Sequence, residues 1–325
     1  MKRVLCLLLP SALACRAAPR IERDEAAAAP SSPAKTSSAR RYATSTTGEP
    51  LTIEGPEISV DRTGVRIGAG PMLVPLVGDG VEGFPAEHKA RGTPTDLELR
   101  ALRVALSEVP KPVAPVLTLH VDPRVTYRML VEVLFTAGVG GFSKFRFVVI
   151  EGGSEVRRSL SLELPSSGTG KPTPSASSKT LPTELDGLSL KSLGALGPGT
   201  PTAAPPGVPP APPGFCGSAP LALTVIVASN GFYVKAFSGA IAPACSTFGA
   251  GPTVPLAGDR QDFAALRACV VKLHDCHPSS VGESFVRVTM TPSGDFQTLV
   301  STWDAVRRRV DGTPLVPDIL LTIVK

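Results

Sequence analysis

The sequence predicts an α+β protein made of two tandem ββαβαβ domains, in each of which the helices pack on one face of a small mixed sheet. The same order of strand and helix patterns occurs twice, and a proline-rich stretch separates the two occurrences. Identical short sequences also recur in matching places. Val74-Pro75-Leu76 returns as Val254-Pro255-Leu256 ahead of the first helix, and Leu130-Val131 returns as Leu299-Val300 within the second. The repeats therefore indicate one folding unit present twice.

The first domain, residues 51–164, begins with a predicted hairpin. Its strands, at 58–60 and 65–67, flank the turn Asp61-Arg62-Thr63-Gly64, which has glycine at its tight position. The elements expected after it are a helix capped by Thr95 and running to Leu106, a strand at 116–121, a helix at 126–137 that stops at Gly138, a strand at 145–150 and an additional edge strand at 160–164.

The second domain, residues 216–325, repeats this order. Strands at 223–227 and 232–236 flank Asn230-Gly231, a strong signal for a tight hairpin. The elements expected next are a helix capped by Asp262, a strand at 285–290, a helix at 296–306 and a closing strand at 319–324. A sheet covered by helices on one face leaves the other face or an edge open for dimerisation or strand addition.

Low-complexity segments separate the domains. Residues 19–50 are rich in Ala, Ser, Thr and Pro and read as a disordered tether, and the Pro/Ser/Gly-rich segment 165–215 reads as a linker. Residues 1–18 have the layout of a signal peptide, because two cations precede an apolar run that is too short to span a bilayer. The formal net charge of +5 falls to +3 without Lys2 and Arg3 (5 − 2), which argues against nucleic-acid binding.

The signal segment also contains a candidate lipidation site. Ala12-Leu13-Ala14-Cys15 resembles a bacterial lipobox, in which the cysteine carries the lipid. The alternative is simple cleavage. The expected location is therefore the periplasm, with the protein either free or lipid-anchored in the envelope and facing the periplasm.

The remaining cysteines favour disulfides, since an even set in an exported chain is seldom left reduced. The four candidates all lie in the second half: Cys216, Cys245, Cys269 and Cys276. Cys269 and Cys276 lie seven residues apart on one predicted helix, about 10 Å along its axis, which is too far for a bond between them. We expect each to pair with Cys216 or Cys245.

Two polar clusters were considered for chemistry. His274-Asp275-Cys276-His277 with Cys269 has the soft ligands that zinc prefers, but oxidised cysteines would remove them. His120 and Asp122 lie two apart at a strand end and so face one side, without a nucleophile in an accompanying motif. We therefore expect no catalytic, cofactor or metal site. Arg307-Arg308-Arg309 follows the last helix, where solvated cations complement the helix dipole or contact anionic lipid or cell-wall polymer.

The second half resembles the periplasmic domain of the ExbD/TolR family of biopolymer transport proteins, and the first half carries a shorter echo of it. The resemblance rests on Asn230-Gly231-Phe232-Tyr233-Val234, Val288-Thr289-Met290 and Trp303-Asp304-Ala305-Val306-Arg307, and on Leu117-Thr118-Leu119-His120-Val121-Asp122 in the first half. The family-motif positions, structural or partner-binding, are Asp122, Tyr127, Asp295, Phe296, Asp304, Leu315, Pro317 and Asp318.

The resemblance implies a non-enzymatic envelope protein that binds proton-channel or outer-membrane partners of an ExbB/ExbD-like system, as an internal pseudo-dimer or a homodimer. Family members carry a membrane helix with a proton-carrying Asp, whereas the apolar run here, Val4 to Ala14, is short and has no acid. An accessory or adaptor role is therefore expected. The alternatives are a peptidoglycan-binding module and an exported metal-binding protein or enzyme.

Overall fold

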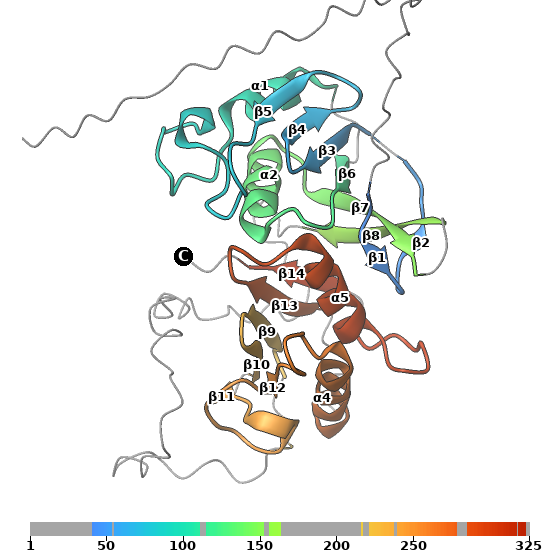
Figure 1. Ribbon diagram of the computed structural model, residues 1–325. Coiled ribbons are helices and arrows are strands. Elements are labelled where there is room, and N and C mark those ends of the chain that lie inside the picture. Colours follow the sequence, from blue (N-terminus) through green and yellow to red (C-terminus); the bar gives the residue numbers. More distant parts are fainter. Residues whose placement is uncertain are drawn as a thin grey trace, which may run out of the picture. The chain divides into compact units, whose positions relative to one another are not determined.

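The computed structural model describes residues 41–53, 55–110, 115–152, 156–163, 216, 221–236, 239–277, 285–316 and 318–322. These residues belong to one compact unit, Arg40–Lys325. The fold is α+β, as the sequence predicts. The described residues form four α-helices and two mixed sheets, one from each half of the chain (Figure 1).

The sheet of the first half has the strand order β2-β8-β7-β6-β3-β4-β5. Its parallel pairs are β3 with β6 and β6 with β7, and its antiparallel pairs are β3 with β4, β4 with β5, β7 with β8 and β8 with β2. The strands are β2 (Glu49–Pro50), β3 (Glu57–Asp61), β4 (Gly64–Ile67), β5 (Met72–Pro75), β6 (Val116–Val121), β7 (Lys144–Glu151) and β8 (Arg157–Glu163). The predicted edge strand exists as β8, but β2 covers its outer side.

The sheet of the second half has the same central order, β11-β10-β9-β13-β14, with β12 also paired to β10. Strand β9 runs antiparallel to β10 and parallel to β13, and β13 runs parallel to β14. The strands are β9 (Thr224–Ala228), β10 (Gly231–Ala236), β11 (Gly239–Ala240), β12 (Val254–Pro255), β13 (Phe285–Met290) and β14 (Asp318–Leu321). The two halves therefore share one topology, with β3, β4, β6 and β7 equivalent to β9, β10, β13 and β14.

A pair of glycines explains why the Val-Pro sequence recurs. Gly64 and Gly231 begin the second strand of each hairpin with φ values of +140° and +133°, which L-residues rarely adopt. A Cβ on Gly64 would lie 2.1 Å from the carbonyl oxygen of Val74, and one on Gly231 would lie 2.3 Å from that of Val254. The Val-Pro strand passes directly over the glycine in both halves, so each hairpin requires glycine there.

The helices are α1 (Arg100–Glu108), α2 (Tyr127–Val139), α4 (Phe263–Cys276) and α5 (Phe296–Arg307), with short 3-10 helices η1 (Ala86–His88) and η2 (Pro243–Cys245). Asp262 caps α4 as predicted, accepting from the Ala265 N–H at 2.9 Å. The predicted start of α1 at Thr95 is wrong, because Leu99 forms an antiparallel bridge with Lys89 and donates its N–H to Thr136. Helix α2 runs one residue past the predicted stop at Gly138.

Two further expectations are corrected. The last part of the predicted tether is ordered, since β2 and a further strand, β1 (Thr44–Ser45), lie within it, and β1 pairs in parallel with the end of β7. The first-half sheet is also covered on both sides at its centre. All six residues of β6 are buried, including Thr118 and His120, whose side chains alternate with those of the apolar core.

Candidate functional site

The two halves meet where their equivalent second helices, α2 and α5, begin. Tyr127 donates its N–H to the Gly294 carbonyl at 2.6 Å, and Phe296 donates its N–H to the Val125 carbonyl at 2.9 Å. Equivalent residues of the two halves are 169 positions apart, so Phe296 corresponds to Tyr127 (296 − 127) and Gly294 corresponds to Val125 (294 − 125). The exchange is therefore reciprocal between equivalent residues, as in a two-fold symmetric dimer.

The next residue of each helix repeats the exchange. Arg128 donates its N–H to the Pro292 carbonyl at 3.1 Å, and Gln297 donates its N–H to the Pro123 carbonyl at 2.9 Å. The first N–H groups of a helix have no partner within it, so each half satisfies those of the other. The prolines that recur at equivalent positions are thus acceptors in this contact between the halves.

The side chains at the centre of the contact complete the helix starts. Thr126 and Asp295 face each other in a bridge, and each caps its own helix: Thr126 accepts from the Met129 N–H and Asp295 from the Thr298 N–H. Aromatic rings fill the space beside them. Phe147 lies 5.4 Å from the ring centre of Phe296.

Phe147 also lies 5.4 Å from the ring centre of Trp303, in an edge-on arrangement. Tyr127 is buried, and its hydroxyl donates to the Thr322 carbonyl at 2.7 Å, from one half to the other. Burial raises the pKa of the Tyr127 hydroxyl. These contacts make the two halves share one hydrophobic core.

A buried carboxylate on α5 holds the N-terminal segment at this contact. The oxygens of Asp304 accept hydrogen bonds from the Ser45 hydroxyl at 2.8 Å, the Thr46 N–H at 2.6 Å and hydroxyl at 3.1 Å, and the Thr47 hydroxyl at 2.5 Å. Asp304 is 6% exposed. Hydrogen bonds to an ionised, desolvated carboxylate are among the stronger ones in proteins. We call residues 44–47 with Asp304 and Gln297 the tether clamp.

Gln297 provides the second part of the tether clamp. Its side-chain oxygen accepts from the Thr44 N–H at 2.8 Å, and its side-chain nitrogen donates to the Thr44 carbonyl at 3.0 Å. Strand β1 meanwhile pairs with Ile150 and Glu151 of β7 in the first half. The end of the N-terminal segment is therefore fixed to both halves at once.

A second buried charge network holds the long connection between β5 and α1. Lys89 donates its ammonium to Glu132 of α2 at 2.8 Å, and both side chains are fully buried. Glu132 also accepts from the Arg128 guanidinium at 2.7 Å and from the Phe84 N–H at 2.9 Å. Lys89 makes a further hydrogen bond to the Pro94 carbonyl. The corresponding connection of the second half, between β12 and α4, is much shorter.

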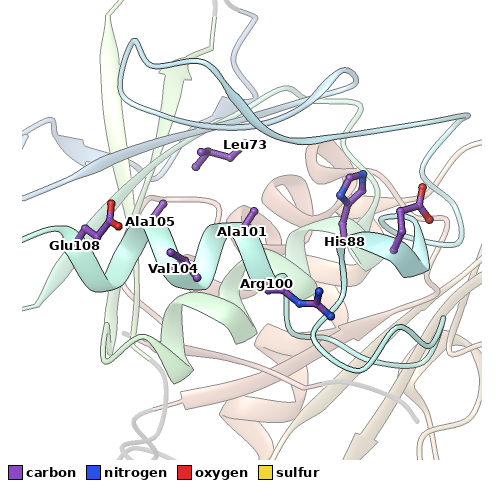
Figure 2. Close-up of a pocket in the computed structure, with 8 residues that line it drawn as sticks. Leu73, His88, Arg100, Ala101, Val104, Ala105 and Glu108 are labelled. Atoms are coloured by element: carbon purple, nitrogen blue, oxygen red, sulfur yellow. The ribbon is translucent and has the colours of Figure 1, made fainter.

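An open groove of about 460 Å³ runs along α1 beside this connection (Figure 2). Leu73 of β5 and the α1 residues Ala101, Val104 and Ala105 form its apolar surface. Charged and polar side chains surround that surface: Glu87 and His88 from η1, and Arg100 and Glu108 from the two ends of α1. The groove was not predicted from the sequence, because the helix start and the η1 turn that define it were not.

The structure gives the predicted His120 pair a different partner. His120 Nε2 lies 2.7 Å from a Glu57 carboxylate oxygen, and its Nδ1 lies 3.5 Å from the Tyr42 hydroxyl. Asp122 instead accepts from the N–H and the guanidinium of Arg124 at the strand end. The two residues thus serve separate contacts and do not form a catalytic pair with each other.

The cysteines form two disulfides, Cys216–Cys276 and Cys245–Cys269, with Cα–Cα distances of 4.9 and 5.5 Å. Each cysteine of α4 thus pairs with one outside the helix, as expected. Cys269 and Cys276 are oxidised and so cannot supply the thiolates that the considered zinc site would need. Among the described residues, no group of three or more His, Cys, Asp or Glu side chains is placed to bind a metal ion.

The arginine run after α5 differs from the solvated cations that we expected. All three side chains are half-buried. Arg309 pairs with Asp275 and lowers the pKa of that carboxyl, whereas burial lowers the pKa of the Arg307 guanidinium. Arg309 therefore ties the segment after α5 to the end of α4.

The other family-motif residues are structural where they are described. Leu315 is buried and donates its N–H to the Arg307 carbonyl at 2.7 Å, and Asp318 opens β14 opposite Phe285. Cys15 and Pro317 lie outside the described residues. Sequence reasoning missed Lys89, Glu132 and Gln297. Glu132 alone left a signal, as a single acid within the otherwise apolar stretch Met129–Phe135.

Among the described residues, none of the helices combines the length and apolar character that a membrane span requires. No protein-family model, curated protein or solved structure matches the chain.

Proposed function

We propose that the chain is a non-enzymatic adaptor of the bacterial cell envelope that binds partner proteins of a proton-driven, ExbD/TolR-type transport system. The observation that carries the proposal is the reciprocal contact at the starts of α2 and α5. Four of the residues on which the family resemblance rests lie at or beside it: Tyr127, Asp295, Phe296 and Asp304. This supports a reading in which each half is a copy of the family's periplasmic domain and the two copies replace a dimer of two chains.

The tether clamp gives such an adaptor a mechanical connection. In our proposal the N-terminal segment leads to the inner or outer membrane, either through a lipid on Cys15 or through a bound partner. Its residues 44–47 are hydrogen bonded to both halves through β7 and Asp304. A pull on the N-terminus would therefore load the contact between the halves and both domains together.

The disulfides support the periplasmic location in this proposal. The structural contacts of the polar side chains support its non-enzymatic role. Two disulfides are typical of an oxidising compartment such as the periplasm. The side chains singled out for chemistry have structural partners: Cys269 and Cys276 are oxidised, and His120 is paired with Glu57.

The test is to identify the partner in the producing bacterium. The full-length chain with a C-terminal affinity tag is cross-linked in intact cells with a membrane-permeable amine reagent and purified under denaturing conditions. We expect a polytopic channel subunit of the ExbB/TolQ class among the cross-linked proteins, above the level seen with a tagged periplasmic protein of unrelated fold. Recovery of no such subunit would refute the adaptor role, and binding to purified sacculi without it would favour a peptidoglycan-binding module.

An Asp304→Asn variant is the matched control, because it keeps the size of the side chain while weakening the tether clamp. If the N-terminal segment transmits force or position, the variant should yield less of the cross-linked subunit per molecule of variant recovered from the envelope, a ratio that allows for its lower stability. Equal yields would show that the tether clamp has no part in partner binding.

A further inference from the structure

We propose that the disulfide Cys216–Cys276 is a thiol–disulfide exchange site for a dithiol protein, and that its opening releases the end of the linker from α4. The other disulfide, Cys245–Cys269, is a permanent part of the second-half core. Such an exchange site operates whether or not the chain is an adaptor, because it needs only a dithiol protein in the same compartment.

The two disulfides differ in their exposure to solvent. Cys245 and Cys269 are 2% and 4% exposed, and both belong to the hydrophobic core. Cys216 is exposed and Cys276 is half-buried. A thiolate must reach a disulfide sulfur to attack it, so access is one of the factors that set the rate of exchange. A protein in solution can therefore reach Cys216–Cys276, whereas the folded chain shields Cys245–Cys269.

The two disulfides also differ in what they join. Cys245–Cys269 joins η2 to the middle of α4, two elements that pack against each other. Cys216–Cys276 joins the first residue after the linker to the last residue of α4. Cys216 makes no hydrogen bond, ion pair or ring contact besides this bond with any residue that the structure describes. Opening the disulfide therefore removes the specific contact that holds Cys216 to α4.

The sequence around Cys216 contains little that could cover its sulfur. It reads Pro213-Gly214-Phe215-Cys216-Gly217, with glycine directly after the cysteine and two positions before it. Glycine has no side chain, so neither of these positions can shield the disulfide. A bulky reagent such as another protein therefore meets less obstruction here than it would at a cysteine between large side chains.

The exchange takes place in two steps. The thiolate of the dithiol protein attacks Sγ of Cys216, the more exposed cysteine, so that the bond to Cys276 breaks and a mixed disulfide forms. Cys276 leaves as a thiolate and takes up a proton. The second thiol of the dithiol protein then loses its proton, attacks its own partner sulfur and releases Cys216 as a thiol. Two electrons and two protons pass to the chain, and the dithiol becomes a disulfide.

The rates at which the two disulfides are reduced test this assignment. The full mature chain is mixed with reduced thioredoxin, precipitated with acid at successive times, dissolved in denaturant with N-ethylmaleimide and analysed by peptide mass spectrometry. We expect the initial rate of labelling at Cys216 and Cys276 to be at least tenfold higher than at Cys245 and Cys269. Initial rates are compared because the loss of one disulfide can loosen the other. Equal rates, or faster labelling of the buried pair, would overturn the proposal.

A trapping experiment identifies the cysteine that is attacked. A thioredoxin whose second active-site cysteine is replaced by serine cannot resolve the mixed disulfide and stays on its target. We expect the trapped complex of the wild-type chain to be linked through Cys216, and a link through any other cysteine would refute the mechanism. Cys216→Ser combined with Cys276→Ser keeps the buried disulfide and should trap at least tenfold less thioredoxin. The mapping on the wild-type chain does not depend on the stability of this variant.

Release of the linker end is measured by proteolysis. Chymotrypsin cleaves after aromatic residues, and Phe215 directly precedes Cys216. When only Cys216–Cys276 has been reduced and alkylated, cleavage after Phe215 should be at least fivefold faster than in the oxidised chain. Cleavage after Phe232 and Trp303, which are buried in the fold, should stay the same. Equal cleavage after Phe215 in both states would show that the disulfide does not hold the linker end, and faster cleavage at all three sites would show that it stabilises the whole second half instead.

Discussion

Removing one member of the buried pair Lys89–Glu132 should destabilise the protein far more than replacing both. Neither side chain is exposed to solvent, and the Lys89 Nζ lies 2.8 Å from the Glu132 Oε1. Taking away one partner of such a pair leaves a desolvated charge and costs about 3–5 kcal/mol. Glu132→Gln keeps a side-chain oxygen that can accept from Lys89, as the Pro94 carbonyl does, but it removes the negative charge beside the buried ammonium, so we expect a loss of about 4–5 kcal/mol.

Lys89→Met should cost less, about 3 kcal/mol, because Glu132 keeps the Arg128 guanidinium and the Phe84 N–H. The double variant should be no less stable than Glu132→Gln alone, which gives a coupling free energy of at least about 3 kcal/mol. The assay is urea unfolding followed by circular dichroism and by fluorescence of Trp303, the single tryptophan. Additive losses in the double variant would refute this account of the connection between β5 and α1.

The same pair makes stability depend on pH. Burial raises the pKa of the Glu132 carboxyl above the ordinary value of 4.5, although Lys89, the Phe84 N–H and Arg128 act in the opposite direction. The folded state then holds a proton that the unfolded state has already released, so unfolding free energy falls as pH rises from 4.5 through the folded pKa. Comparison with Glu132→Gln, in which this part of the dependence should vanish, checks the sign. A wild-type curve parallel to that of the variant would contradict it.

Three further changes test the repeat, the tether clamp and the disulfides. Gly64→Ala and Gly231→Ala should each cost about 3 kcal/mol in urea unfolding, because each Cβ would meet a carbonyl oxygen at a positive φ, and a large difference between them would argue against a shared hairpin design. Asp304→Asn should lower the unfolding free energy by about 3 kcal/mol and speed amide hydrogen exchange at residues 44–47. Unchanged exchange would mean that Asp304 does not hold this segment. Replacing Cys245 and Cys269 by Ser should cost about 3.5 kcal/mol by loop entropy, and thiol titration of the native mature chain should find all four cysteines of the second half blocked.

Local patterns in the sequence predicted the repeated elements well. Alternating apolar residues around a glycine gave both hairpins, and β6 and β13 occur at the residues expected. The cap at Asp262 was predicted, because a short polar side chain before an apolar helical stretch has one main use; Thr126 and Asp295 cap their helices in the same way but were not predicted as caps. Thr95 met the same rule and failed, since Leu99 is drawn into a bridge with Lys89 and no pattern within 95–106 reports that contact.

The site depends on contacts between distant residues, which no local pattern encodes. Asp304 was identified through the family resemblance, but its partners at 45–47 lie in a stretch whose composition predicts disorder. The ordering entropy of that stretch is offset only after both halves provide β7 and α5 for it to bind. Helix geometry excluded a bond between Cys269 and Cys276 and left two possible pairings of the four cysteines. Which of the two forms depends on the tertiary fold, and the structure has Cys216–Cys276 and Cys245–Cys269.

The two halves hold the connection before their first helix by different means. In the second half, η2 lies against α4 and β12 and is bonded to α4 through Cys245–Cys269. In the first half, the longer connection between β5 and α1 is held by the buried pair Lys89–Glu132. Loss of one partner of a buried pair leaves an uncompensated charge, whereas a disulfide acts mainly by constraining the unfolded chain. One topology therefore carries two different devices at equivalent places, and the identical Val-Pro sequences that precede them do not reveal the difference.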